Sequence, residues 1–305
     1  MEISVDFLSF LTPVHLVSAG IICYSLKNKE GRRPGKEGRL LKKRILSAVI
    51  LLSITFCCVL LSEVTRVLFL AAAGILCCYE LSRQLEKLEV YCSAWVMYVY
   101  IASQAVLALF HARVTVYLVS FLGSVYLAMF SGILRKRVSG NGALDTVAGL
   151  GYPGFLFAVL LMISVSPHWL KVLTLGCISS WMCDTAALVG GTALGKHKLA
   201  PHISPNKTVE GALCGALSSI PTGALLALLP FMDGVSVPLG ILTAFIASSL
   251  GQVGDLAESM LKRMIGIKDF SDLIPGHGGV FDRADALLFS IPAAYICLYV
   301  AGAAR

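Results

Sequence analysis

A dense run of carboxylates, basic residues and glycines near the carboxyl end of the chain has the residue types of a phosphate and metal site. The stretch 254–286 reads GDLAESMLKRMIGIKDFSDLIPGHGGVFDRADA. Asp255, Glu258 and Lys262 are spaced to share one face of a helix. The PGHGG turn that follows offers bare backbone N–H groups to an anion. These parts suit phosphoryl or nucleotidyl transfer, whereas the plainer interpretation is a solvated loop with a Glu258–Lys262 ion pair.

A second polar cluster, residues 181–211, reads WMCDTAALVGGTALGKHKLAPHISPNKTVEG. Asp184 lies inside an apolar segment, where an ionisable residue is a functional candidate by default. Residues 190–197 nearly match the phosphate-binding P-loop, but His197 replaces the required hydroxyl residue and the segment follows no predicted strand. The P-loop interpretation is therefore rejected. The cluster still supplies candidate phosphate contacts, namely Lys196, Lys198, Asn206 and Lys207.

The composition places both clusters in an integral membrane protein. The chain has 305 residues, of which 57% are apolar and 14% are charged. Soluble domains have roughly 45–50% apolar and about 25% charged residues, so a soluble enzyme and a disordered chain are both excluded. The net charge of +7 comes from basic residues grouped in short loops, which is typical of membrane orientation and does not indicate nucleic acid as a partner.

Long apolar segments predict an all-α, polytopic fold with about nine or ten transmembrane helices. A span needs roughly 17–25 mostly apolar residues. The candidates are 7–26, 45–61, 67–81, 91–110, 114–134, 149–166, 170–191, 210–230, 235–256 and 284–304. The segment 67–81 is short and carries Glu80 near its end, so it is the one that leaves the count at nine or ten.

The distribution of basic residues predicts the orientation. With ten spans and an outer amino terminus, 21 of the 25 basic residues fall in inner loops. Those in outer loops are Arg66, Arg113, Lys171 and Arg305. This asymmetry favours a multi-pass protein whose polar clusters face the cytoplasm, and the compact length leads us to expect the plasma (inner) membrane. We expect an amino-terminal region of helices and basic loops, 1–145, and a catalytic region, 146–305, which carries the loops 181–211 and 254–286.

These polar clusters resemble the signature of the phosphatidate cytidylyltransferase (CDP-diacylglycerol synthase) family, S-x-x-K-R-x4-K-D followed by P-G-H-G-G-x-x-D-R-x-D. The pattern is met by Ser259, Lys262, Arg263, Lys268, Asp269, Pro275, Gly276, His277, Gly278, Gly279, Asp282, Arg283 and Asp285. The upstream block resembles the family through Asp184, Lys196, Lys198, Ser204, Pro205, Lys207, Thr208, Glu210 and Gly211. Departures such as Ala186, Asn206 and Ala284 leave the charged positions of the core signature intact.

The resemblance implies a reaction in which CTP and phosphatidate give CDP-diacylglycerol and pyrophosphate. A phosphomonoester is largely deprotonated at neutral pH, so the lipid phosphate needs no general base to attack the α-phosphorus. Catalysis then reduces to positioning and charge neutralisation by Mg²⁺, with two cations expected. CTP, phosphatidate and membrane lipid are the expected partners, and a homodimer is left open.

Residue roles follow from this expectation. We expect the metal ligands to be Asp255 and Asp282, with Asp285 and Asp184 as further candidates. The expected catalytic residues are Asp255, Asp282, Lys262, Arg263 and Arg283. The expected substrate-binding residues are Lys196, Lys198, Ser204, Asn206, Lys207, Lys268, His277, Gly278 and Gly279. For His277 a purely structural role in the turn is equally open.

Two alternatives use the same residues. One is a membrane enzyme that uses CTP to phosphorylate a lipid alcohol, with His277 as a spare base. The other is a cation-coupled transporter built on Asp184 and Asp255. A transporter is expected to have mid-bilayer polar groups on broken helices, often in repeated halves. In this sequence the polar groups gather at one predicted face without a repeat, which disfavours transport.

Overall fold

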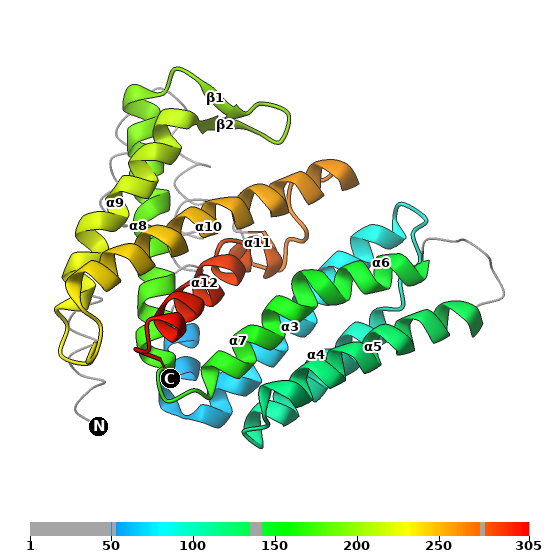
Figure 1. The fold of residues 1–305 in the computed structure, drawn as a ribbon. Helices are drawn as coiled ribbons and strands as arrows, with labels where there is room; N and C mark the ends of the chain where they lie inside the picture. The colour runs from blue at the N-terminus through cyan, green and yellow to red at the C-terminus, as the bar shows by residue number, and fades with distance from the viewer. Residues whose placement is uncertain (1–49, 51–52, 135–141, 275–277, 305) are drawn as a thin grey trace.

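The computed structural model describes residue 50 and residues 53–134, 142–274 and 278–304, and within them the chain is an all-α bundle (Figure 1). Seven helical stretches are long and apolar enough to cross a membrane, and one shorter apolar helix, α4, has 16 residues. Each of the eight spans predicted from residue 67 onward coincides with one of these. The predicted span 7–26 lies outside the described residues, and of the span 45–61 residues 53–61 are helical. The prediction of a multi-pass membrane protein is confirmed.

The amino-terminal group of helices comes first along the described chain. It consists of α3 (Glu63–Glu86), α4 (Ala94–Leu109), α5 (Val114–Leu134), α6 (Gly142–Gly149), the π-helical turn η1 (Leu150–Phe155) and α7 (Leu156–Ser164). Helix α3 packs on α4 and α7, and α5 packs on α4 and α6. The last three elements form one candidate span, Gly142–Ser164, which begins seven residues before the predicted span 149–166 and is broken at η1. There Tyr152 leaves helical geometry and Pro153 has no backbone N–H to donate.

The carboxyl-terminal group contains both polar clusters. It consists of α8 (Trp169–Leu194), the strands β1 (Lys198–Ala200) and β2 (Ser204–Thr208), α9 (Val209–Ala227), α10 (Val237–Ile265), α11 (Phe281–Ala284) and α12 (Leu287–Val300). Helix α9 packs on α8 and α10, and α12 packs on α8 and α10. Helix α12 also contacts α7, and α11 contacts α3, so the two groups share a boundary on which the site is built.

Helix α3 is much longer than the apolar segment 67–81 that predicted it. Ser62 begins the helix with a capping box, in which its side chain and that of Thr65 each accept a backbone N–H. At the other end, the polar residues Glu80, Ser82 and Gln84 are buried. These last turns face protein instead of lipid and contain polar residues. A span predicted from apolar residues alone therefore ends before the helix does. This segment forms a full-length helix and is counted as a span.

Arg66 lies inside α3, whereas the loop count placed it outside the membrane. Its guanidinium is buried, with Nε donating to the carbonyl of Ser164 at 2.7 Å and Nη1 to that of Val59 at 3.0 Å. The same group lies 3.8 Å from the ring centroid of Trp169, a cation–π contact. Arg66 therefore ties the start of α3 to the junction between α7 and α8.

The long helix α10 exceeds the width of the bilayer core, and its last turns carry the first polar residues of the signature. Its 29 residues make it about 43 Å long, against about 30 Å of hydrocarbon. The β1–β2 hairpin lies near this end of α10, because Arg263 Nε donates to the carbonyl of Ile203 at 3.2 Å. Both polar clusters therefore lie at one end of the bundle (Figure 1).

Labelling of single cysteines should confirm this topology. In a background freed of the ten native cysteines, a cysteine at exposed Asp233, in the loop between α9 and α10, should react with an impermeant reagent outside intact cells. Cysteines at Lys198 and Lys268 should react only after permeabilisation, because they lie at the opposite end and in the more basic loops. Reaction at Asp233 and Lys268 from the same side would contradict the arrangement.

Candidate active site

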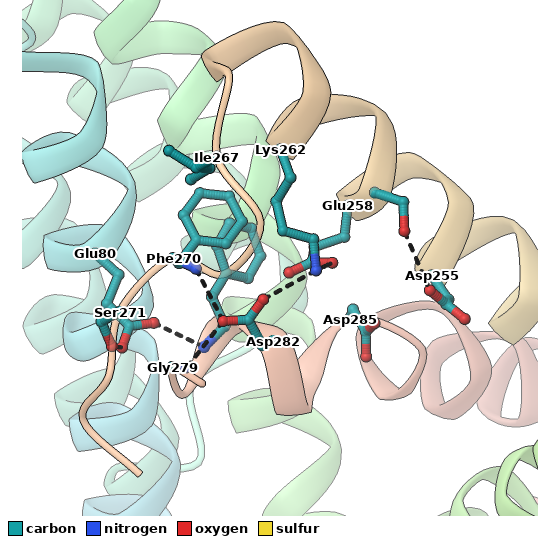
Figure 2. A network of polar contacts seen from close by, with 12 residues as sticks. Glu80, Asp255, Glu258, Lys262, Ile267, Phe270, Ser271, Gly279, Asp282 and Asp285 are labelled. Atoms are coloured by element: carbon teal, nitrogen blue, oxygen red, sulfur yellow. Dashed lines mark hydrogen bonds and ion pairs between the residues drawn. The ribbon is translucent and has the colours of Figure 1, made fainter. Parts of the chain in front are cut away.

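Asp282 organises the loop that joins α10 to α11. Its Oδ2 accepts the backbone N–H groups of Phe270 at 2.9 Å and Gly279 at 2.8 Å, and its Oδ1 accepts Lys262 Nζ at 2.9 Å (Figure 2). The carboxylate is buried. Both of its oxygens are thus already occupied by charged or backbone donors. Through these contacts the residue joins Phe270 and Gly279 to Lys262 near the end of α10.

Lys262 lies between two buried carboxylates. In addition to Asp282, its Nζ contacts Glu258 Oε2 at 2.5 Å, one helical turn away (Figure 2). The Glu258 side chain is 0% exposed. The i,i+4 pair suggested by the spacing is therefore present, but it is buried instead of solvated. One ammonium group cannot balance two ionised carboxylates, so a full negative charge on both would be costly inside the protein.

Asp255 lies on α10 one turn before Glu258, and its side chain contacts the β1–β2 hairpin. Lys207 Nζ at the end of β2 contacts Asp255 Oδ2 at 2.5 Å, and the two side chains are 29% and 30% exposed. Ser259 Oγ lies 3.5 Å from the other oxygen, Oδ1. Asp255 is therefore reachable from solvent and still has an oxygen with room for a further partner.

Asp184 and Asp285 gather around Asp255. Asp184 comes from α8 and Asp285 from the junction of α11 and α12, and each lies near enough to Asp255 for electrostatic interaction. Gly254 permits this approach, since a Cβ there would lie 2.6 Å from the ring of Phe289 and 2.7 Å from the carbonyl of Asp285. Three carboxylates from three helical segments thus surround the accessible part of the site.

The donor chemistry suits a hard divalent cation. Oxygen ligands are what Mg²⁺ prefers, and the cluster holds more acidic groups than neighbouring lysines. In the described part of the chain, however, no three His, Cys, Asp or Glu side chains lie close enough to hold one ion together. Mg²⁺ commonly binds through one or two carboxylates and completes its coordination with phosphate oxygens and water. The residues present fit that mode of binding.

The remaining predicted residues differ in their surroundings. Exposed basic side chains lie on the hairpin, on α11 and in the loops beside them, and these are Lys196, Lys198, Lys268 and Arg283. Arg263 is exposed too, but it donates to the backbone carbonyls of Ile203 and Ile267. Ser204 and Asn206 lie on β2, and Gly278 has a positive φ of 85°. His277 lies outside the described residues, so its predicted role stays a prediction.

Two residues at the site were missed by the sequence analysis. Glu80 of α3 accepts hydrogen bonds from the backbone of the signature loop, as Figure 2 shows. Tyr152 packs against the rings of Phe281 and Phe289, with centroids 5.3 Å and 5.8 Å away, and its hydroxyl is buried with no hydrogen-bond partner among the described residues. The signal for Glu80 in the sequence is an acidic residue near the end of an apolar segment, which by itself indicates a short span and not a site residue.

Comparison with known proteins assigns the chain to a family. The model of the cytidylyltransferase family matches residues 42–301. The chain belongs to the cytidylyltransferase family. It is similar to the phosphatidate cytidylyltransferase of Brucella suis, with 34% identity over 270 residues, which cover 86% of this chain and 93% of the relative. The enzyme of the same name from Staphylococcus saprophyticus is 35% identical over 176 residues, 57% of this chain and 66% of that protein.

Membership of the cytidylyltransferase family makes this protein a nucleotidyltransferase. The matched region spans all the described helices from α3 to α12. It therefore includes the amino-terminal helices that the sequence signature left unassigned, along with both polar clusters. The resemblance proposed from the two clusters is confirmed.

Substitution of the two central aspartates should separate chemistry from loop folding. Asp255→Asn should lower turnover about 100-fold or more with little change in thermal stability, because it removes an accessible charge from a site that must neutralise phosphates. Asp282→Asn should lower turnover similarly and also lower the melting temperature, because its amide cannot accept from all three donors. The exposed Asp272→Asn is the matched control. Turnover of either variant above a tenth of the control would contradict the assignment.

Proposed function

We propose that this member of the cytidylyltransferase family transfers CMP from CTP to phosphatidate, giving CDP-diacylglycerol and pyrophosphate. The observation that carries the proposal is the carboxylate and lysine cluster of Asp184, Asp255, Asp285 and Lys207, placed at one end of a membrane bundle. A water-soluble nucleotide can reach such a site, while the acyl chains of a lipid stay among the helices. The names of the similar proteins from Brucella and Staphylococcus support the same reaction.

The reaction requires little acid–base chemistry from the protein. A phosphate oxygen of the lipid attacks the α-phosphorus of CTP, forming a new P–O bond, and the bond to the β-phosphate breaks to release pyrophosphate. The lipid phosphate is largely deprotonated at neutral pH, so no side chain must accept a proton. The protein's task is to bring two anions together and to balance their charge. The cations Lys196, Lys198, Lys268 and Arg283 are exposed in the two signature clusters and suit binding of the phosphates.

We further propose that Mg²⁺ is the cofactor, with two ions bound when both substrates are present. Asp255, Asp285 and Asp184 would each supply a carboxylate to one of the ions, with phosphate oxygens and water completing the coordination, because their oxygens are the accessible ones. Asp282 is the other candidate from the sequence, although its oxygens already accept three donors. A bound cation would supply charge neutralisation for the triphosphate. Lys207 would then be released from Asp255 toward the phosphates.

The proposed enzyme acts from the cytoplasmic face of the plasma membrane. The loops at the site's end of the bundle contain most of the basic residues, and such loops stay inside. CTP is a water-soluble nucleoside triphosphate, so it would enter from the cytoplasm, past the exposed cations of the hairpin.

Labelled nucleotide distinguishes this reaction from phosphorylation of a lipid alcohol. Purified protein given phosphatidate should move label from α-³²P-CTP, and none from γ-³²P-CTP, into chloroform-extractable lipid. The reason is that an anionic phosphate attacks the α-phosphorus unaided, whereas a lipid alcohol needs a base to attack the γ-phosphorus efficiently. The control is the same assay with the Asp255→Asn variant.

Transfer of the γ label to a lipid alcohol would overturn the proposal and assign the base to His277. Absence of transfer from either label, with cation uptake into proteoliposomes, would favour the transporter instead.

Removal of the cation should abolish the reaction reversibly. Treatment with EDTA should eliminate transfer of the α label, and added Mg²⁺ should restore it. Conservative Asp255→Glu should shift the Mg²⁺ concentration for half-maximal activity at least threefold, because it moves the ligand oxygens. Full activity in EDTA would contradict the cofactor assignment.

A further inference from the structure

Glu80 is a buried acid from a helix far from the signature in sequence. It lies near the end of α3, and the residue is only 2% exposed. A carboxylate in such a place is costly unless it is satisfied by hydrogen bonds. The structure places it against the segment between α10 and α11, about two hundred positions later in the chain.

Three donors satisfy the Glu80 carboxylate. Oε1 accepts the Ser271 hydroxyl at 2.6 Å and the backbone N–H of Val280 at 3.0 Å. Oε2 accepts the backbone N–H of Phe281 at 2.9 Å. Val280 and Phe281 directly precede Asp282, so Glu80 fixes the backbone from which that carboxylate projects (Figure 2).

Gly279 shows how closely the two segments meet. A Cβ at this position would lie 2.5 Å and 2.6 Å from the two carboxylate oxygens of Glu80. The N–H of the same glycine donates to Asp282 Oδ2 at 2.8 Å. The loop is therefore held by two carboxylates at once, with Asp282 binding it from within and Glu80 from the neighbouring helix.

A second hydrogen bond from α3 supports the same arrangement. The buried Gln84, one turn after Glu80, donates its Nε2 to the carbonyl of Phe270. Phe270 in turn donates its N–H to Asp282 and stacks on Phe281 with ring centroids 4.6 Å apart. Helix α3 therefore contacts both ends of the folded loop.

We infer that Glu80 is a positioning residue for cytidylyl transfer, acting through the backbone at Val280 and Phe281 on the placement of Asp282 and Asp285. This inference rests on the proposed function. Glu80 hydrogen-bonds the loop backbone and does not contact the accessible carboxylates. Its effect on the substrate therefore passes through the groups that this backbone orients. Loss of orientation without loss of binding lowers kcat more than it changes KM.

The test compares Glu80→Gln with Glu86→Gln, the same substitution at an exposed position of the same helix. Gln keeps one acceptor oxygen, so at least one of the three donors loses its partner. The kcat of Glu80→Gln should fall tenfold or more, with KM for CTP within twofold of the control. Glu80→Asp, which keeps the charge, should recover part of this loss. Ser271→Ala, which removes one donor and leaves both backbone N–H groups bound, should stay within about threefold of wild type.

Hydrogen exchange supplies a measurement that does not depend on turnover. In Glu80→Gln, the amides of Val280 and Phe281 should exchange at least tenfold faster than in the control, while those of α8 stay unchanged. A kcat equal to that of Glu86→Gln, a change in KM alone, or unaltered exchange at both amides would overturn the inference. A wild-type protein that lacks cytidylyl transfer would instead overturn the proposed function, and this role with it.

Discussion

Several acidic side chains are buried at one end of the membrane bundle, and the structure depends on how their charge is compensated. Lys262 is central to this, since its ammonium group lies between Glu258 and Asp282 at 2.5 Å and 2.9 Å. A buried carboxylate without a partner is strongly destabilising, and breaking such a pair costs several kcal/mol. The pair therefore sets where the loop after α10 can go, because Asp282 can satisfy its remaining oxygen only with the backbone of Phe270 and Gly279.

Two classes of acid result from this arrangement. Glu80, Glu258 and Asp282 are buried; Glu80 and Asp282 accept backbone N–H groups and hold the loop in place, while Glu258 faces Lys262. Asp255 and its neighbours Asp184 and Asp285 surround an accessible space with fewer lysines than carboxylates. The buried acids give the site its shape, and the accessible ones leave it with a negative charge. A nucleotidyltransferase needs both, because its transition state is sensitive to position and to charge.

Sequence reasoning succeeded where the information is local. Continuous apolar runs located every span from residue 67 onward, and the segment 114–134 coincides with α5. The spacing of Asp255, Glu258 and Lys262 predicted their shared helix face. It could not reveal Glu80, Arg66 or Tyr152, because their partners lie far away in the chain and depend on how helices pack. The β1–β2 hairpin was missed as well, since its few residues show no clear alternation of polar and apolar side chains.

Arg66 and Glu80 together have a consequence for how the protein sits in lipid. They lie about 21 Å apart along α3, and each is buried in contact with residues beyond that helix. Sliding α3 along the membrane normal would break one of these charged contacts. In a bilayer whose hydrophobic thickness differs from that of the bundle, the mismatch must therefore be absorbed by the lipid or by the peripheral α5, whose face is largely exposed. The distance of the candidate site from the Arg66 end of α3 is thus set by the protein and does not follow the thickness of the surrounding membrane.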